Sequence, residues 1–284
     1  YIPLETKADC LLSNYRGYIQ YIAGNYIIPC SRGVYMFDGK GKFVRRIGRQ
    51  GQGPGEYQLI YDAQIDEAGG RIYLLPWNAR SLLAYDLKGQ AVQNIPLPSL
   101  VPKGVFKANT KDSLLSVFLL PFDYLPYVAW TQKFNGEIQD TIRSRHLAIK
   151  PDFSNEVYSN KNGADFDVSL FVFWERRPDS LYHYANGRLN PRFTMHFAKK
   201  EIPIHDYKEL PRHFLGSTSV EKQLDENNFT TEVPADFIMD KESLKGAFYK
   251  VENDYLGNLP IPWFPYNCSN GYYTANMEPA TYKL

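Results

Sequence analysis

The stretch Tyr35-Met36-Phe37-Asp38-Gly39-Lys40-Gly41-Lys42-Phe43 contains a tight turn between strand-forming residues, and this turn recurs along the chain. It returns at 84–90 and, in weaker form, at 132–138 and 182–189. The closing glycines are Gly41, Gly89, Gly136 and Gly187, with successive spacings of 48, 47 and 51 residues. A period of about 40–50 residues, with strands on both sides of each turn, is typical of β-propeller blades.

Short segments with strand character fill each interval between these turns. In the first interval they cover 18–23, 26–29, 34–38 and 42–47, and in the second 61–66, 71–75, 81–86 and 91–96. Four short strands joined by tight turns make one blade. The pattern predicts blades at approximately 15–50, 57–99, 103–146, 150–198, 202–251 and 254–284.

The last predicted blade lacks one strand, whereas the chain has an extra segment, Tyr1-Ile2-Pro3-Leu4-Glu5, before the first blade. An open ring would expose the unpaired edges of its first and last blades. We therefore place residues 1–6 in the last blade. The fold prediction is an all-β, six-bladed β-propeller of four-stranded antiparallel blades, closed by its N-terminal strand and forming a single domain over 1–284.

Composition excludes several classes of protein. The net charge is +1, which gives no reason to expect nucleic acid as a partner, because phosphate binding needs a concentrated basic surface. No run of 18 apolar residues exists, so we predict no transmembrane segment. The first residue is Tyr1 and not methionine, and we expect a processed chain whose export signal has been removed.

The three cysteines, Cys10, Cys30 and Cys268, include no C-x-x-C pair, which leaves a zinc site or a thioredoxin-like site without support. Two alternatives remain open for them. In an oxidising compartment, two of the cysteines would form a disulfide and the third would stay a free thiol. In the other case, all three would be buried free thiols.

The loop Ile47-Gly48-Arg49-Gln50-Gly51-Gln52-Gly53-Pro54-Gly55-Glu56-Tyr57, together with 2–6, resembles the six-bladed NHL-like or TolB-like β-propeller family of Bacteroidetes. The stretches 179–193 and 253–260 are also similar to that family. The third blade departs from the pattern, since Phe134-Asn135-Gly136 replaces the aromatic-Asp turn. The resemblance implies an exported protein of the periplasm or outer cell surface, often lipid-anchored, which here would require an anchor upstream of Tyr1. It implies no assigned reaction and no catalytic residues.

In a propeller, the loops between the second and third strands of each blade open on the same face as the connections between blades. We call this the loop face, and ligands of propellers usually bind there or at the mouth of the channel. The residues that we predict to bind a ligand on this face are Arg32, Arg49, Glu56, Tyr57, Trp77, Arg80, Tyr124, Trp174 and Arg176. Arginine grips carboxylate or phosphate with two parallel hydrogen bonds, and aromatic rings stack on sugars or apolar groups.

These loops also have a purely structural interpretation. Aromatic side chains could cap the blades while the arginines remain solvated, since single exposed apolar residues are common. The glycines of 48–57 could cradle an anion with consecutive amides, or they could only form a crossover between blades that Glu56 and Tyr57 hold in place. The Lys-Ser/Thr ending of a P-loop is missing.

No motif in the chain indicates a specific reaction. The five histidines form no H-E-x-x-H, and neither a Gly-x-Ser-x-Gly elbow nor an EF-hand-like loop occurs. His183 and His196 flank one hairpin, where they could approach each other or form a surface pair without function. We predict no catalytic residues, no metal site and no cofactor.

The prediction is a non-catalytic, monomeric binding propeller of the cell envelope whose partner is a glycan, a peptide or an envelope protein. The alternative is a propeller enzyme with a site at the channel mouth, of the metal-dependent lyase or lactonase type, because one scaffold hosts many functions.

Overall fold

The structure is a computed structural model, and it describes residues 2–13, 19–53, 56–160, 166–173, 175, 177–197, 202–226, 228–250, 252–254, 257–260, 267–269 and 272–274. The chain divides into two compact units, Tyr1–Asp152 and Phe153–Leu284, which are described separately below. Two short 3-10 turns, η1 (Ala8–Cys10) and η2 (Arg145–Leu147), are the named helical elements, and all the other named elements are strands. The chain is therefore all-β, as predicted.

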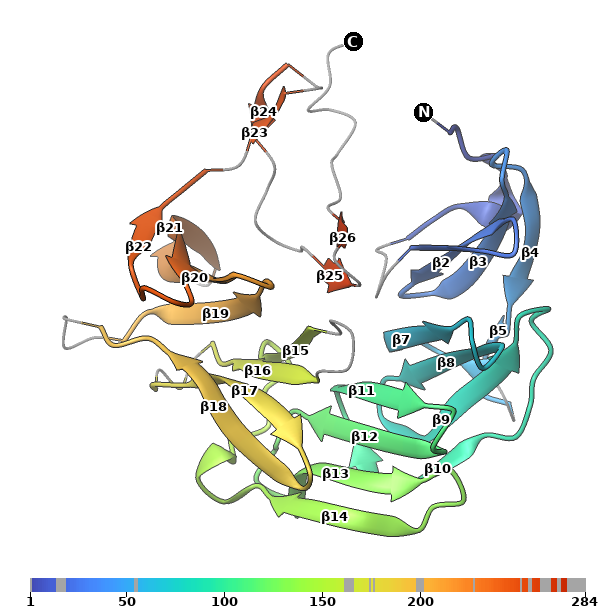
Figure 1. Cartoon of the computed structure of the whole chain (residues 1–284), viewed down its shortest axis with the longest axis horizontal. Coiled ribbons are helices and arrows are strands. Elements are labelled where there is room, and N and C mark those ends of the chain that lie inside the picture. The colour runs from blue at the N-terminus through green and yellow to red at the C-terminus, as the bar shows by residue number, and fades with distance from the viewer. Residues whose placement is uncertain are drawn as a thin grey trace. The chain divides into compact units, whose positions relative to one another are not determined.

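The first unit contains three four-stranded antiparallel sheets in which sequence neighbours pair (Figure 1). The first sheet consists of β1 (Gln20–Ile22), β2 (Asn25–Cys30), β3 (Gly33–Asp38) and β4 (Phe43–Ile47). The second consists of β7 (Ile60–Asp66), β8 (Arg71–Pro76), β9 (Ala79–Asp86) and β10 (Ile95–Val101). The third consists of β11 (Gly104–Asn109), β12 (Leu114–Leu119), β13 (Tyr127–Lys133) and β14 (Ile138–Arg143). Two short parallel segments, β5 (Arg49–Gln50) and β6 (Glu56–Tyr57), pair between the first two sheets along the sequence.

The second unit contains two further sheets of the same kind. The fourth sheet consists of β15 (Glu156–Asn160), β16 (Asp167–Phe171), β17 (Ser180–Ala185) and β18 (Arg188–Thr194). The fifth consists of β19 (Ile204–Glu209), β20 (His213–Gln223), β21 (Phe229–Asp240) and β22 (Gly246–Phe248). In the predicted sixth blade and just before it lie two short antiparallel pairs, β23 (Glu252–Asn253) with β24 (Leu259–Pro260) and β25 (Asn267–Ser269) with β26 (Tyr272–Thr274). Most of that blade lies outside the described residues.

The recurring turn joins the third and fourth strands of the first three sheets. Gly41, Gly89 and Gly136 have φ angles of 83°, 81° and 94°, which only glycine adopts without strain. In the first turn the Asp38 carboxylate accepts hydrogen bonds from the main-chain N–H groups of Lys40 and Lys42, both at 2.9 Å. This arrangement matches a three-residue hairpin loop in which the glycine forms a bulge.

The third and fourth turns differ from the first two in sequence. The third has Lys133 where the first has Asp38, yet its main-chain bonds are the same, and the Lys133 ammonium instead pairs with Glu137 at 2.9 Å. In the fourth turn Ala185 pairs with Arg188 across a two-residue loop, in which Asn186 and Gly187 have φ angles of 50° and 67°. Two positive φ angles are typical of a type I′ turn, so the fourth repeat has a shorter loop than the other three.

One predicted strand position needs correction. The fourth strand of the second sheet is β10 at Ile95–Val101, and not 91–96, because an irregular segment follows the turn, and its contact with β9 is an isolated bridge between Ala91 and Tyr85. The segment 199–228, whose sequence is polar with scattered prolines and predicts a strand pair with long insertions, does contain a strand pair, β19 with β20.

The N-terminal segment does not form a strand at residues 2–7. The main-chain N–H of Glu5 donates to the carbonyl of Gly41 at 2.8 Å, and the Glu5 carboxylate accepts the N–H of Phe43 at 2.9 Å. The segment therefore lies against the outer turn of the first sheet. Closure of a ring by this segment is not confirmed.

Apolar side chains of the first two sheets form one core cluster of the first unit. Ile27, Val34 and Met36 from the first sheet pack with Ile72 and Leu74 from the second. Side chains also join the second sheet to the third. The Asp62 carboxylate accepts the main-chain N–H of Phe106 at 3.0 Å, and the Gln64 amide bonds to both main-chain groups of Ala108.

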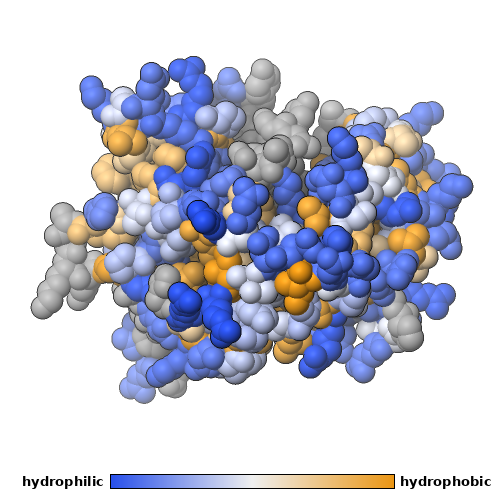
Figure 2. All heavy atoms as spheres, turned by 60° about the horizontal axis from the view of Figure 1, so that its bottom comes forward, coloured by the Kyte–Doolittle hydropathy of each residue, from blue (hydrophilic) through white to orange (hydrophobic). Residues whose placement is uncertain are grey.

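Hydrophilic residues cover much of the face shown in Figure 2, and the apolar ones occur singly or in small groups between them. Scattered apolar residues of this kind are normal on a folded protein surface. They do not by themselves mark a docking surface.

Candidate binding site

Main-chain hydrogen bonds connect the loops that form the loop face of the first unit. The N–H of Ile60, at the start of the second sheet, donates to the carbonyl of Ser31 in the β2–β3 turn at 2.8 Å. The N–H groups of Trp77 and Asn78, in the β8–β9 turn, donate to carbonyls of the connections before the second and third sheets. The turns between second and third strands thus lie beside the connections between sheets, as the sequence predicted.

The predicted arginines of the first unit, Arg32, Arg49 and Arg80, are exposed. Tyr124 is 56% exposed, and its ring lies 5.8 Å from that of the fully buried Phe122. These four side chains are accessible to a ligand. They are also consistent with the structural interpretation, in which Tyr124 covers Phe122 and the arginines are solvated.

Glu56 and Tyr57 stabilise the loop 48–57, to which they belong. The Glu56 carboxylate accepts the main-chain N–H of Gly53 at 2.9 Å, so this amide already has an anionic partner. Tyr57 is only 2% exposed, and its hydroxyl donates to the carbonyl of Ile47 at 2.9 Å. Burial raises the pKa of Tyr57 above its usual range. These contacts favour the structural interpretation of the Gly48–Tyr57 loop.

Trp77 is half-buried and has an internal cation beside its ring. The ammonium of the buried Lys103 lies 5.3 Å from the centroid of the Trp77 ring and 5.9 Å from that of Tyr61. Cation–π contact of this kind stabilises a lysine away from water. The ring therefore contributes to packing at the start of the third sheet.

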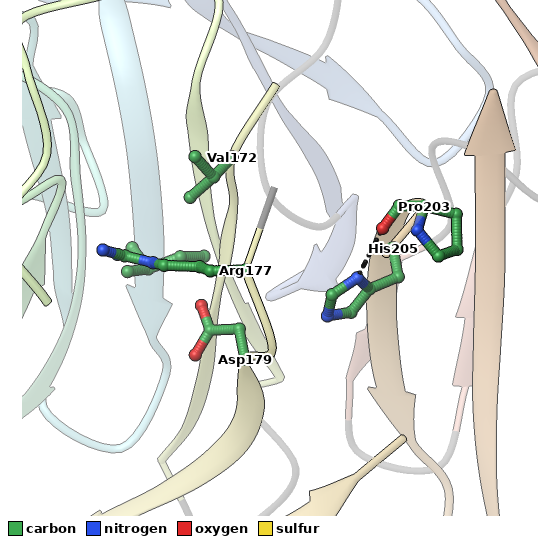
Figure 3. A pocket seen from close by; sticks show the side chains of 6 residues that line it. Val172, Arg177, Asp179, Pro203 and His205 are labelled. Atoms are coloured by element: carbon green, nitrogen blue, oxygen red, sulfur yellow. Dashed lines mark hydrogen bonds between the residues drawn. The ribbon is translucent and has the colours of Figure 1, made fainter. Parts of the chain in front are cut away.

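In the second unit the β16–β17 loop carries the remaining predicted residues. Trp174 and Arg176 lie outside the described residues. Their neighbours Arg177 and Asp179 line a pocket with Leu170, Val172, Pro203 and His205. The enclosed space is small, about 10 Å³, which is room for about one water molecule, and it opens into a wider region of about 250 Å³ that includes solvent. Figure 3 shows Val172, Arg177 and Asp179 on one side and Pro203 and His205 on the other.

His205 is 8% exposed and has a defined tautomer. Its Nδ1 lies 2.9 Å from the carbonyl of Pro203, and because a carbonyl only accepts, Nδ1 carries the proton (Figure 3). In the neutral ring Nε2 is then an acceptor, and this buried atom has no hydrogen-bond partner within the described residues. The rings of Phe197 and Tyr207 lie 5.1 and 5.4 Å from the imidazole and hold it in place.

Asp179 is 6% exposed and is positioned by the neighbouring strands. Its Oδ1 accepts the main-chain N–H of Ser180 at 2.8 Å, and its carbonyl accepts the Tyr207 hydroxyl at 2.9 Å. Burial raises the pKa of Asp179, while the N–H of Ser180 and the charge of Arg177 oppose that rise. Its buried Oδ2 makes no hydrogen bond of good geometry among the described residues, and the hydroxyl of Tyr182 also interacts with this carboxyl, which further opposes the rise in its pKa.

Asp179 and His205 were missed as site residues in the sequence. Asp179 does fall in a stretch that resembles the propeller family, but nothing in its neighbours distinguishes it from a structural aspartate. His205 belongs to no motif. Both become candidates only because the connection that ends at β19 brings Pro203 and His205 beside the β16–β17 loop.

A second cluster of charges joins the fourth and fifth sheets. His183 Nδ1 lies 2.8 Å from the carboxylate of Asp167, its partner across β16 and β17. The carboxylate of Glu209, from β19, bonds to Arg192 at 3.1 Å and to the Lys241 ammonium. Burial raises the pKa of Asp167 to about 6; His183 opposes the rise, and the neighbouring Glu209 adds to it. His183 thus has an acidic partner of its own.

Other predicted features of the site can be checked only in part. Cys10 and Cys30 are free thiols buried in one apolar cluster, and burial raises the pKa of Cys30 to about 11. The side chain of Cys268 lies outside the described residues. Within the part of the chain that is described, no three His, Cys, Asp or Glu side chains are placed to hold a metal ion. None of the described helices is long and apolar enough to cross a membrane.

Solved structures of the same fold support the predicted architecture. One is a Bacteroides fragilis protein described as exported, with 16% identity and a TM-score of 0.57 over 87% of this chain and 74% of that chain. Another is hydrazine synthase from Kuenenia stuttgartiensis, with 14% identity and a TM-score of 0.54 over 89% of this chain and 70% of that chain. The fold class, an all-β propeller of four-stranded antiparallel blades, is confirmed.

A search of curated proteins found no match to this chain. The sequence model of one family matches residues 1–283, which is nearly the whole chain. The family's description is "Domain of unknown function (DUF4934)". The closer relationship to NHL-like or TolB-like propellers stays a prediction. With its sheets, its loop face and its full-length match, the chain belongs to the DUF4934 family.

Proposed function

We propose that this protein is a non-catalytic binding propeller of the bacterial cell envelope, exported to the periplasm or the outer surface, that holds its ligand on the loop face. The ligand classes are those of the sequence analysis: a glycan, a peptide or a partner protein. Export is supported by the structural neighbour from Bacteroides fragilis, which is described as an exported protein. A lipid anchor and a monomeric state stay predictions.

The pocket beside the β16–β17 loop is the observation that carries this proposal. It combines the charged Arg177 with two buried polar atoms, Asp179 Oδ2 and His205 Nε2, that make no hydrogen bond of good geometry among the described residues. A buried polar atom without a partner costs about 1–3 kcal/mol, so a small polar group of a ligand that reached either atom would offset that cost. The exposed Arg32, Arg80 and Tyr124 offer further polar and aromatic contacts on the loop face of the first unit.

The alternative of a metal-dependent lyase or lactonase stays a prediction. Asp179 and His205 are residue types that move protons in enzymes. No observation among the described residues places a third acidic or histidine ligand with them, and none favours this alternative over binding.

An array of immobilised glycans and peptides, probed with the purified protein, tests the proposal. We expect binding to a restricted set of spots. Arg177→Ala should lose that binding, whereas Arg188→Ala, which changes an exposed arginine at the β17–β18 turn of the same unit, serves as the matched control. No binding on the array, or equal binding by the wild type and Arg177→Ala, would overturn the proposed site.

Fractionation of the source bacterium, followed by immunoblotting, tests the location. We expect the protein in the periplasmic or membrane-associated fraction. Recovery in the cytoplasmic fraction alone would contradict the envelope assignment.

A further inference from the structure

We infer that the far end of the β20–β21 hairpin is a docking site for a basic, extended segment of a partner protein, which pairs with the free edge of β21 as an additional strand. This end, residues 219–234, is the hairpin extension. It contributes none of the residues that line the pocket of the proposed function, so the inference goes beyond that function. The position of the hairpin extension, its main-chain edge and its charge lead to this inference.

The hairpin extension lies on the loop face of the second unit. β20 and β21 are the second and third strands of the fifth sheet, and loops between such strands open on that face. Their pairing continues for four residue pairs past Ser219, the last residue of β20 that pairs with β19. At about 3.3 Å per residue, these pairs carry the hairpin about 13 Å past the sheet. Val220 and Leu224 are 40% and 63% exposed, and every other side chain of 220–228 whose exposure the structure describes is exposed as well.

The outer side of β21 is a free strand edge within the hairpin extension. β22 and the main-chain N–H of Tyr249 bond to β21 only at 236–239. No described strand pairs with 229–235 on that side. A free edge carries main-chain N–H and C=O groups that can bind an extended peptide as a further strand. The partner therefore needs an extended conformation and accessible main-chain groups of its own.

A β-bulge separates the hairpin extension from the rest of the sheet. Ser219 on β20 is opposite both Val233 and Pro234 on β21, because the register shifts between the pairs on either side of it. A bulge bends its strand and interrupts the ladder, and proline has no N–H to donate. We therefore expect the added strand to pair with 229–233, whose five residues match the usual length of a strand.

The hairpin extension is strongly acidic. It contains four acidic residues and one lysine, which gives it a net charge of −3 in a chain whose net charge is +1. Asp225 and Glu226 at its tip are exposed. Two copies of this chain that paired edge to edge would bring these like charges together, and their repulsion opposes self-association. A segment with lysine or arginine is attracted instead. The charge therefore favours a basic segment of another protein.

Selection from a phage-displayed library of random nonapeptides tests the inference. The wild-type protein is the target. A variant in which Asn-Gly replaces 219–234 serves for counter-selection, since Thr218 and Ala235 would then flank a two-residue type I′ turn. We expect the selected peptides to have a net positive charge and residues that favour strands. A synthetic copy of one of them should bind the wild type at least about tenfold more tightly than the variant.

Two controls separate strand addition from attraction between charges alone. Replacing only the tip, 224–228, by Asn-Gly keeps the edge at 229–233, and binding should stay within about threefold, since exposed charges contribute little. Successive residues of a strand direct their main-chain groups to opposite edges. Methylating every second amide nitrogen of the peptide should therefore weaken binding about tenfold in one of the two patterns and leave it nearly unchanged in the other. This comparison needs no protein variant, so it holds even if the shortened protein does not fold.

Each other outcome overturns the inference. Equal binding of the selected peptides to the wild type and the shortened variant would do so, as would acidic peptides or equal losses from both methylation patterns. A dimer of the wild type that the shortened variant does not form, measured by analytical ultracentrifugation, would assign the edge to a second copy of this chain. If no peptide is enriched, the inference falls, whereas Arg177-dependent binding on the glycan and peptide array would still support the proposed function.

Discussion

Gly41 closes the first recurring turn and also touches the N-terminal segment. Its φ angle is 83°, and a Cβ atom added there would overlap the carbonyl of Pro3. Gly24, in the β1–β2 turn, has nearly the same φ angle of 81° but has no atom within 4 Å of the position of a Cβ. Substitutions at the two glycines therefore distinguish the cost of backbone strain, which both share, from the cost of a steric clash, which occurs only at Gly41.

We expect Gly41→Ala to destabilise the protein more than Gly24→Ala. Both alanines must adopt a left-handed conformation, which costs about 1–2 kcal/mol. At position 41 the methyl group must also displace Pro3, together with the hydrogen bond between Glu5 and Gly41. Urea unfolding of both variants measures the difference. Equal losses of stability would mean that the Pro3 contact contributes nothing.

The buried carboxyl of Asp167 makes the stability of the protein depend on pH. Its pKa is raised to about 6, from 3.8 in a model compound, chiefly by burial. The native state therefore keeps a proton that the unfolded chain releases, so stability falls as the pH rises between these two values. Glu209 has a lowered pKa, so its contribution to the stability of the native state is instead lost as the pH falls below about 4.5.

Asp167→Asn should remove this fall in stability. Asparagine cannot titrate, but its side-chain carbonyl can still accept a hydrogen bond from His183. The free energy of unfolding of the variant, compared with that of the wild type, should rise from about pH 4.5 to about pH 6.5. Urea denaturation at several pH values measures it. Parallel pH profiles for the two proteins would rule out Asp167 as the titrating group.

The β20–β21 hairpin extends beyond its neighbours in the fifth sheet. Its two strands pair as far as Gln223 and Phe229, whereas β19 pairs with β20 only up to Ser219 and β22 reaches β21 only at Phe237–Met239. The extension continues past the start of β19, on the side where Pro203 and His205 line the pocket. Since no other described strand pairs with it, its removal should cost the sheet little.

Replacing 219–234 by Asn-Gly tests this expectation, because Thr218 and Ala235 would then flank a two-residue type I′ turn. The melting temperature should change by only a few degrees, corresponding to about 1 kcal/mol. The matched control replaces only the tip, 224–228, by Asn-Gly between Gln223 and Phe229. Loss of cooperative unfolding in the shorter variant but not in the control would show that the extension supports the sheet.

At the scale of the whole molecule, side-chain hydrogen bonds link successive sheets within each unit. In the first unit, Asp62 and Gln64 on the inner strand β7 bond to the main chain of β11. In the second unit, the buried Asp206 on β19 accepts a bond from Ser169 on β16 at 3.4 Å. The chain divides into two compact units, and a single domain that spans both stays a prediction.

The turn glycines and the alternating strands were predictable because they obey local rules. A positive φ angle requires glycine or asparagine, and period-two alternation follows from the pleat of a strand, so both are visible in a short window of sequence. The shifted strand β10 and the extended hairpin were not predictable, since pairing with neighbouring strands decides where a strand ends. The bond of the N-terminal segment to Gly41 was not predictable either, and its place in the last blade stays a prediction.

The candidate site likewise combines features that the sequence predicts with features that only the structure reveals. From its own residues the sequence determined an all-β chain of repeated four-stranded blades, and it pointed to the loops where a ligand would bind. Only the tertiary structure decided which side chains are available there: it buried Tyr57, placed Lys103 beside Trp77, and brought Asp179 and His205 to one pocket. Burial and hydrogen-bond pairing depend on residues far apart in the chain, and no local pattern records them.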